Sequence, residues 1–320
     1  GTASLCLCHS AVIILCGKIR MGNFGKAEKR KLDDRNGGES MTVPEWAIVG
    51  LTALGVCLAA VRIRLAVRAA RARGKKMRRW EIGASKTIGS REVQEDEYGI
   101  RETEDGLMAV MADGMGKQFG GKIASRTVVE VFLEVFGDPT AFYNPQYSFR
   151  KGFQSANREV LKKLDDQQGW ASAAVIMIKD RRLYYAAVGN VKAAVYRNHE
   201  LVPVTSGHTI SVLARQRYEE GKLTRQEAAS LLDHHRLYNY VGQDGFRDIE
   251  FFDTPISLYG GEYVVLMTDG IYEGVRWKEL EDCLESGGKC QDMAFEMVEL
   301  LNRSEEEDKD NGAVVVVKVG

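Results

Sequence analysis

The sequence lacks the cysteine patterns and the charge excess that mark several common protein classes. Its six cysteines among 320 residues match no zinc-site spacing and are too few for a disulfide scaffold. The formal net charge is -1, so no overall field favours nucleic acid, and we expect no nucleic-acid partner. Internal repeats and long low-complexity stretches are also missing. With 44% hydrophobic residues, the composition is that of a globular protein with a sizeable core.

Long apolar runs are scarce as well, and only one approaches the length of a membrane span. Residues 46–61 contain no charge, but this run is shorter than the ~20 residues of a spanning helix. Arg62 and Arg64 follow it and can extend their charged groups toward water, which lengthens the buried segment. We therefore predict a single-pass membrane helix over residues 46–69. An amphipathic helix that lies on the membrane or packs on the folded domain is the alternative.

Basic residues cluster directly after the apolar run. Between Arg62 and Arg79 there are nine Lys and Arg residues and no acidic one. The positive-inside rule therefore predicts that everything after Arg62 is cytoplasmic. The chain is predicted to consist of a poorly ordered segment 1–45, the membrane segment 46–69, a basic linker 70–80 and one folded domain 81–320.

The folded domain mixes apolar stretches of strand length with helical periodicity. The predicted strands are 107–112, 173–178, 183–188, 193–196, 263–268 and 313–319. The predicted helices are 123–136, 149–164, 226–232 and 293–301. Short polar breaks between the middle strands require hairpins and hence an antiparallel sheet. Helices in separate blocks around antiparallel strands indicate an α+β layered architecture.

Three of these apolar stretches adjoin an aspartate. The stretches around residues 107–112 and 263–268 lead into Asp113-Gly114 and Asp269-Gly270, and we expect both strands to stop there. The last stretch follows Asp310. Carboxylates at the ends of central strands can converge on one point while the sheet holds them rigid, so these residues are candidates for one site.

Such a cluster of carboxylates points to divalent cations. Converging carboxylates repel one another and cannot all ionise in a dry site without a counter-charge. Because no His or Cys accompanies them, Mg²⁺ or Mn²⁺ fits better than zinc. Two such ions about 3.5–4 Å apart can activate a bridging water and polarise a phosphate. A single Asp-Gly is more often a turn than a ligand, so it is the ordered set that indicates a metal site.

In their order along the chain, these residues resemble the motifs of the metal-dependent type 2C serine/threonine protein phosphatases. The motifs are Arg91-x-x-x-Glu95-Asp96, Ala112-Asp113-Gly114-Met115-Gly116, Thr268-Asp269-Gly270 and Asp310-Asn311. Residues 112–125 resemble the bacterial form of the family, in which Met follows the Asp-Gly. The resemblance covers about residues 80–320. It implies a sandwich of two antiparallel β-sheets flanked by α-helices.

The resemblance also implies a role for each residue of the set. It implies two Mn²⁺ or Mg²⁺ ions, bound by the ligands Glu95, Asp113, the Gly114 carbonyl, Asp269 and Asp310. It implies catalytic roles for Arg91, which would hold the phosphate, and for Asp96, which would orient the water shell. The implied reaction is hydrolysis of phosphoserine and phosphothreonine on proteins by a two-metal-activated water. The implied substrates are phosphorylated proteins, the targets of a cytoplasmic serine/threonine kinase.

The sequence departs from the family pattern in three segments. Asn190 replaces the Asp of Gly-Asp-Ser-Arg and Lys192 replaces its Arg, which implies that a third, weaker metal site is impaired. Gly169-Trp170-Ala171-Ser172 stands for Gly-Thr-Thr. Gly207-His208-Thr209 stands for Asp-His-Ser. The last two changes put the positioning of the core and of a neighbouring loop in doubt.

Two alternatives to this function stay open. A catalytically weak or silent phosphatase-like module for binding or sensing would account for Asn190 and the altered segments, although no metal ligand is missing. A phosphatase for anti-sigma-type regulators differs from the first reading only in its substrate. A cysteine-phosphatase mechanism has no candidate, because the chain contains no Cys-x₅-Arg loop. Lys117 and Lys122 near the Asp113 loop are interpreted as exposed lysines, with extra phosphate contacts as the alternative.

Overall fold

The computed structural model describes residues 51, 54–65, 80–165, 167–232, 236–246 and 248–320. They belong to two units, 1–71 and 72–320, which are described separately. In the first unit residues 54–65 are helical and exposed. They are part of the predicted membrane segment 46–69. Apart from residue 51, the rest of that segment lies outside the described residues, as do the predicted segment 1–45 and residues 70–79 of the predicted linker 70–80. No helix in the described ranges is long and apolar enough to cross a membrane.

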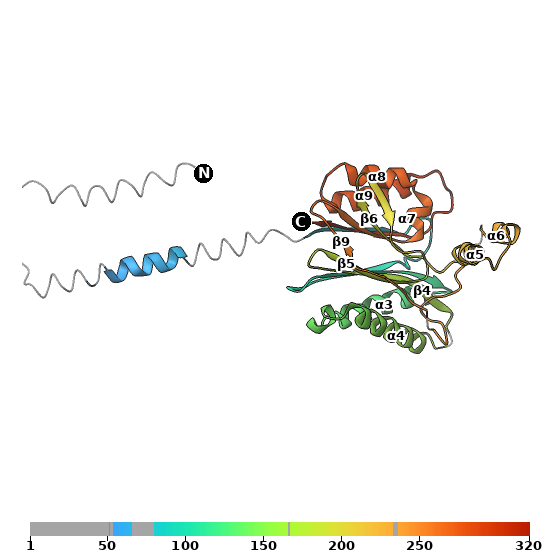
Figure 1. Ribbon diagram of the computed structural model, residues 1–320, viewed down its shortest axis with the longest axis horizontal. Coiled ribbons are helices and arrows are strands. Elements are labelled where there is room, and N and C mark those ends of the chain that lie inside the picture. Colours follow the sequence, from blue (N-terminus) through green and yellow to red (C-terminus); the bar gives the residue numbers. More distant parts are fainter. Residues whose placement is uncertain (1–50, 52–53, 66–79, 166, 233–235, 247) are drawn as a thin grey trace, which may run out of the picture. The chain divides into compact units, whose positions relative to one another are not determined.

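The second unit is built on two antiparallel sheets that lie face to face (Figure 1). The order of the first sheet is β1 (Trp80–Thr87), β11 (Gly312–Val319), β10 (Tyr263–Met267), β6 (Lys192–Arg197) and β7 (Glu200–Pro203). The order of the second sheet is β2 (Glu97–Glu102), β3 (Leu107–Gly116), β4 (Gly169–Lys179), β5 (Arg182–Val188) and β8 (Glu250–Phe251), with β9 (Ile256–Ser257) also paired to β5.

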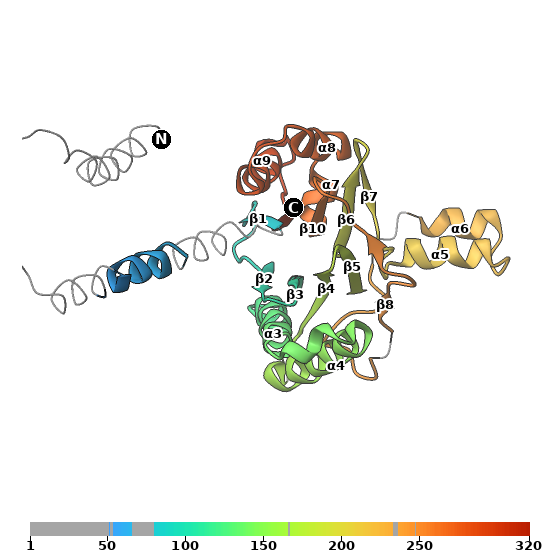
Figure 2. The ribbon, with the colours of Figure 1, turned by 60° about the vertical axis from the view of Figure 1, so that its left-hand side comes forward.

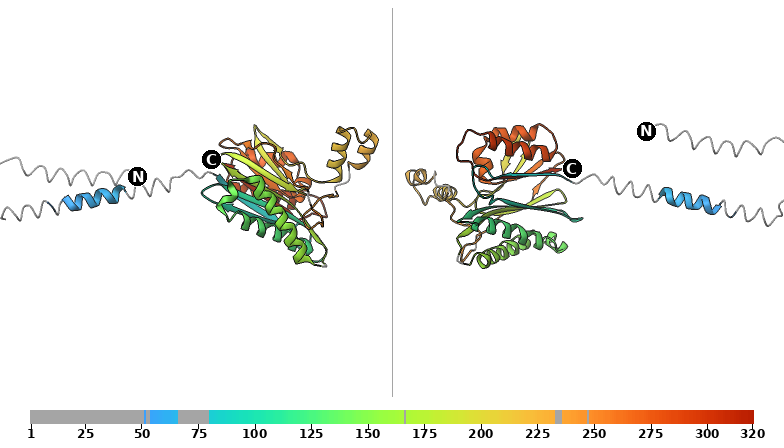
Figure 3. Two further views of the ribbon diagram at one scale, coloured as in Figure 1. Left: turned by 60° about the horizontal axis from the view of Figure 1, so that its bottom comes forward. Right: turned by 180° about the vertical axis from the view of Figure 1, so that it is seen from behind.

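Helices cover the outer face of each sheet (Figures 1 and 3). Those on the second sheet are α3 (Gly120–Val135) and α4 (Pro145–Leu164), joined through the short 3₁₀ helix η1 (Pro139–Phe142). Those on the first sheet are α7 (Asp269–Gly274), α8 (Trp277–Glu285) and α9 (Cys290–Arg303). Two further helices, α5 (Ile210–Glu219) and α6 (Arg225–Leu231), project away from the sheets (Figure 2).

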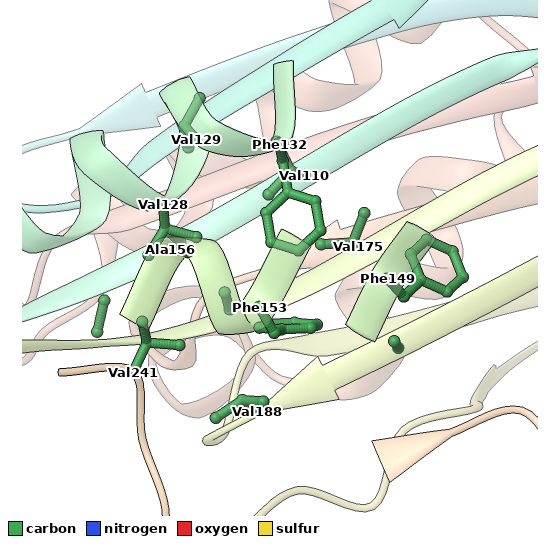
Figure 4. Close-up of a cluster of buried hydrophobic side chains, with 14 of the residues drawn as sticks. Val110, Val128, Val129, Phe132, Phe149, Phe153, Ala156, Val175, Val188 and Val241 are labelled. Atoms are coloured by element: carbon green, nitrogen blue, oxygen red, sulfur yellow. The ribbon is translucent and has the colours of Figure 1, made fainter. Parts of the chain in front are cut away.

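The alternating side chains of β3 separate two apolar cores. Even-numbered residues up to Ala112 face α3 and α4, and odd-numbered residues from Leu107 face the other sheet. In the helix-side core, shown in Figure 4, the ring of Phe132 packs edge-on against that of Phe153 with centroids 4.9 Å apart. The same alternation directs the next odd-numbered side chain, Asp113, into the space between the two sheets.

The predicted α+β sandwich of two antiparallel sheets flanked by helices is confirmed. The predicted strands correspond to β3, β4, β5, β6, β10 and β11, and the predicted helices to α3, α4, α6 and α9. The prediction that the strand of residues 107–112 stops at the Asp-Gly is wrong. β3 continues to Gly116, because Asp113–Gly116 pair with residues 169–172 of β4. The carboxylate of Asp113 is therefore held by a paired strand and does not lie in a turn.

Candidate metal centre

The predicted site residues come from both sheets and meet at one end of the sandwich. Asp113 belongs to β3, Asp269 opens α7 directly after β10, and Asp310 lies just before β11. Glu95 precedes β2. A cleft of about 440 Å³ between them is lined by Arg91, Glu92, Val93, Glu95, Asp113, Gly114, Met115, Gly116, Gln118, Asp269, Asp310 and Asn311. Of the predicted residues, only Asp96 does not line this cleft.

Asp113 is the most buried carboxylate of the cleft, with an exposed fraction of 7%. Burial raises its pKa well above the usual value, and the negative charges of Asp269, Asp96, Asp310 and Glu95 raise it further. A carboxylate in this position needs a cation or a proton to balance it. The negative charges around Asp113 therefore favour the binding of a positive charge in the cleft.

Glu95 is a second carboxylate of the cleft that lacks a full set of partners. Its Oε1 atom is buried and has no hydrogen-bond partner. Burial also raises the pKa of Glu95. A buried carboxylate oxygen without a partner is costly unless another group satisfies it. The residues present thus fit a hard cation that prefers oxygen ligands.

Two glycines allow the backbone to approach the carboxylates. A Cβ on Gly114 would overlap the carbonyl group of Gly121. A Cβ on Gly121 would lie 2.5 Å from Oε1 of Glu95. Close packing of these two backbone segments therefore requires glycine at both positions, and it keeps Glu95 beside the end of β3.

Arg91 and Asp310 form a two-point ion pair at the mouth of the cleft. Arg91 Nε donates to Asp310 Oδ1 over 3.1 Å, and Nη2 donates to Oδ2 over 3.2 Å. Both side chains are about half exposed. Within the described part of the chain, no three Asp, Glu, His or Cys side chains are gathered as a ready ligand group. The carboxylates share a cleft, and Asp310 is turned toward the guanidinium.

Asp96 lies behind the cleft and is held by a residue that the sequence prediction did not assign. Thr268 Oγ1 donates to Asp96 Oδ2 over 2.8 Å and accepts the backbone N–H of Ala313 over 2.9 Å. Burial raises the pKa of Asp96 to about 8. Thr268 therefore connects the end of β10 to the carboxylate next to Glu95 and to β11.

Asn311 is a second unassigned residue that positions the site. Its Oδ1 accepts the backbone N–H of Glu95 over 2.7 Å, and its Nδ2 donates to the carbonyl of Ile88 over 2.8 Å. The side chain is buried, with 5% exposed. It joins the segment that carries Asp310 to the segment that carries Glu95. The Asp310-Asn311 motif was the available sequence signal for this role.

Asn190 forms part of the site because its side chain contacts Asp269. Its Nδ2 donates to Asp269 Oδ2 over 2.8 Å, and its Oδ1 accepts the hydroxyl of Ser172 over 2.7 Å. Its carbonyl accepts the hydroxyl of Tyr272 over 3.0 Å. Nζ of Lys192 lies 3.6 Å from the centre of the Tyr272 ring. An amide and an ammonium group thus stand beside Asp269.

The remaining polar residues singled out from the sequence do not line the cleft of the carboxylates. His208 is buried and accepts the backbone N–H of Gly189 at Nδ1 over 3.0 Å. It lines a separate cleft of about 810 Å³ below α5. Burial lowers its pKa, which favours the neutral ring. Lys117 and Lys122 are exposed, in agreement with their simpler interpretation.

The family described as Protein phosphatase 2C matches residues 83–310. The chain belongs to the protein phosphatase 2C family. This match confirms the family that the order of the sequence motifs indicated. It spans every predicted site residue from Arg91 to Asp310.

Individual relatives of the protein phosphatase 2C family are similar at low identity. The serine/threonine phosphatase Stp of Listeria monocytogenes is 24% identical over 201 residues, 60% of this chain and 77% of Stp. The structure of the Streptococcus agalactiae serine/threonine phosphatase matches with a TM-score of 0.65 and 22% identity, covering 75% of this chain and 100% of that one. The catalytic domain of PstP in complex with two manganese ions matches with a TM-score of 0.55 and 21% identity, covering 75% of this chain and 98% of that one. The structural matches establish a common fold.

Proposed function

We propose that this protein phosphatase 2C member hydrolyses phosphoserine and phosphothreonine on proteins with water activated at the Asp113 cleft. Family membership makes it a hydrolase that acts on phosphoproteins. The observation that carries the proposal is the buried Asp113, which faces the charges of four further carboxylates in a cleft that also exposes Arg91. Two divalent cations, Mn²⁺ or Mg²⁺, would supply an activated water and charge neutralisation there.

Each predicted site residue receives a role in this proposal. The protein ligands are Glu95, Asp113, the Gly114 carbonyl, Asp269 and Asp310. Arg91 binds the phosphate, since its guanidinium can form two parallel hydrogen bonds to phosphate oxygens as it does to Asp310. Asp96 orients water from behind the ligands, and Thr268 holds its carboxylate in place. In-line attack of the activated water on phosphorus would then need no nucleophilic side chain.

Asn190 does not fit a third metal site. Its amide nitrogen donates to a carboxylate oxygen of Asp269 and offers a donor where a further cation would need an acceptor, and the positive charge of Lys192 interacts with Asp269. We propose that the chain binds two catalytic ions and that the third site is impaired.

The test is phosphate release from a phosphothreonine peptide by the whole chain, with Mn²⁺ and with excess chelator. We expect metal-dependent release that is abolished in Asp113→Asn. The matched control is Asp292→Asn, an exposed position on α9, which should keep the activity. Absence of metal-dependent release from folded protein contradicts the proposal.

A second candidate, a weak or silent binding module, is favoured by Asn190 and by the altered 169–172 segment. It predicts that Mn²⁺ binds, as measured by calorimetry, while phosphopeptides bind without being hydrolysed. The same experiment therefore separates the two functions.

We also propose that residues 46–69 form a single-pass membrane anchor, with the phosphatase domain on the cytoplasmic side near the targets of a serine/threonine kinase. The uncharged run 46–61 supports this, as do the exposed apolar side chains of its described part, which are Leu51, Leu54, Val56, Leu58, Val61, Ile63 and Leu65. Alkaline carbonate washing of membranes from expressing cells provides the test. Retention in the pellet supports a span, release indicates a surface helix, and a fully soluble chain contradicts both.

A further inference from the structure

The strand pair that carries Asp113 continues beyond it toward the surface. β3 and β4 pair Asp113 with Ser172 and then Met115 with Trp170. Side chains two residues apart on a strand point to the same face. Trp170 therefore lies on the same face as Asp113, one cross-strand pair and roughly 7 Å farther along the strands. Met115 lines the metal cleft, so Trp170 stands at the rim of that cleft.

One more aromatic residue lies next to Trp170. The rings of Trp170 and Tyr240 are 5.7 Å apart between centroids, at an interplanar angle of 41°. Two hydrogen bonds of 2.9 Å between Ala171 and Val241 fix these neighbouring segments. We refer to Trp170 and Tyr240 as the aromatic shelf.

Packing inside the domain does not account for this pair. None of the apolar core clusters of the described residues includes Trp170 or Tyr240, and both residues are partly exposed. The aromatic shelf is therefore accessible to a bound molecule.

The distance from the cleft limits what the aromatic shelf can bind. An extended peptide advances about 3.3–3.6 Å per residue. With a phosphoresidue in the Asp113 cleft, the side chain one or two residues away reaches the shelf. The occupant is therefore part of the substrate itself, next to the phosphorylated position.

The charge near the shelf determines which kind of substrate side chain fits it. Aromatic faces bind apolar groups and also cations. The backbone N–H of Lys117 donates to Gln168, two residues before Trp170, over 3.0 Å, and the lysine is exposed. This positive charge disfavours an Arg or Lys on the substrate, so an apolar side chain fits best.

We propose that the aromatic shelf determines specificity by binding an apolar side chain one or two residues from the phosphoserine or phosphothreonine. The preferred substrates are then phosphoproteins with an apolar residue beside the phosphorylated one. This inference rests on the proposed phosphatase function and names the substrate class of that same site.

The test uses matched phosphothreonine peptides that differ only at the flanking positions, with Leu, Ala or Arg. With the whole chain and Mn²⁺, we expect kcat/KM to be about tenfold higher for Leu than for Ala, the size of one modest apolar contact. The Arg peptide should be no better than the Ala peptide. In Trp170→Ala the ratio of Leu to Ala should fall close to one, and in Tyr240→Ala it should fall in part.

Tyr259→Ala is the matched control, because Tyr259 is an exposed aromatic residue outside the lining of the cleft, and it should keep the full ratio. Tyr240→Ala changes a partly exposed side chain, so it tests the shelf even if Trp170→Ala folds poorly. An unchanged ratio in Tyr240→Ala and in folded Trp170→Ala overturns the proposal, as does a preference for Arg.

Peptide binding, measured by fluorescence anisotropy, separates this inference from the proposed function. If no peptide is hydrolysed but the Leu peptide binds more tightly than the Ala peptide in a Trp170-dependent way, the phosphatase function fails and the shelf is supported. If peptides are hydrolysed without any flanking preference, the shelf fails and the phosphatase function stands.

Discussion

Asn190 donates a hydrogen bond from its side-chain amide to Oδ2 of Asp269 over 2.8 Å. One lone pair of a predicted metal ligand is therefore used by the protein. The amide is itself oriented by Ser172, whose hydroxyl donates to Asn190 Oδ1. This hydrogen bond occupies Oδ2 of Asp269 and leaves the other carboxylate oxygen to face the cleft.

The first prediction concerns the number of bound ions. Asn190→Asp replaces the amide donor with a second carboxylate next to Asp269, and two adjacent carboxylates need a counter-charge. We expect one additional, weakly bound Mn²⁺ in equilibrium dialysis. Asn190→Ala removes the same hydrogen bond without adding charge and should bind no extra ion. An equal number of ions in wild type and Asn190→Asp would contradict the prediction.

The second prediction concerns Thr268, which is fully buried. Thr268→Val keeps the shape of the side chain but leaves Asp96 and the N–H of Ala313 without their partner. We expect a loss of about 1–3 kcal/mol in the free energy of unfolding in urea, together with a lower kcat. Thr268→Ser keeps the hydroxyl and should retain most of both. Equal losses in the two variants would show that the methyl group matters and the hydrogen bond does not.

The third prediction concerns pH. Burial raises the pKa of Asp96 to about 8 and that of Asp269 to about 6, both from 3.8. Groups with a raised pKa bind protons more tightly in the folded state. Their contribution to stability is complete below the unfolded pKa and is lost as the pH rises through 6 and 8.

With chelator present, the protein should therefore melt at a lower temperature at about pH 8.5 than at about pH 6, and Mn²⁺ should stabilise it more at the higher pH. The measurement is differential scanning calorimetry at both pH values. Asp96→Asn should reduce the difference between them. A chelated protein that is more stable at the higher pH would contradict the assignment.

The fourth prediction concerns the glycine that packs against Glu95. In Gly121→Ala the new methyl group meets Glu95 Oε1 and the backbone of Gly114, so the carboxylate must move. We expect the affinity for Mn²⁺ to fall roughly tenfold or more, as found when groups that orient metal ligands are changed. Gly288→Ala is the control, since the nearest atom to its Cβ is 4.0 Å away. Calorimetric titration measures both variants, and equal affinities would remove Gly121 from the site.

The three aspartates could be predicted from the sequence because each adjoins a strongly apolar strand. Residues 313–319 are apolar except for Lys318, and the position of such a strand next to an Asp is visible without a structure. Asp113 lies in the cleft with the other candidates, but the prediction that its strand ends there is wrong. Its continued pairing depends on β4, which lies far along the chain.

The residues that orient the carboxylates could not be assigned in this way. Thr268 meets Asp96 across 172 positions of the sequence, and Asn311 meets Glu95 across 216. Such contacts depend on how the two sheets are stacked, and no local pattern encodes that arrangement. For the same reason Trp170 could be noted as unusual, but its neighbour Tyr240 could not be identified.

The pairing of β1 with β11 determines when the metal cleft can form during synthesis of the protein. The first strand of the domain pairs with the last, and β11 also pairs with β10. During synthesis, β1 can pair with β11 only after β11 has left the ribosome. Asp310 and Asn311 directly precede β11 and emerge just before it. A nascent or truncated chain that lacks β11 and the two cleft residues before it therefore has no complete cleft. The phosphatase can become active only after this segment has been made.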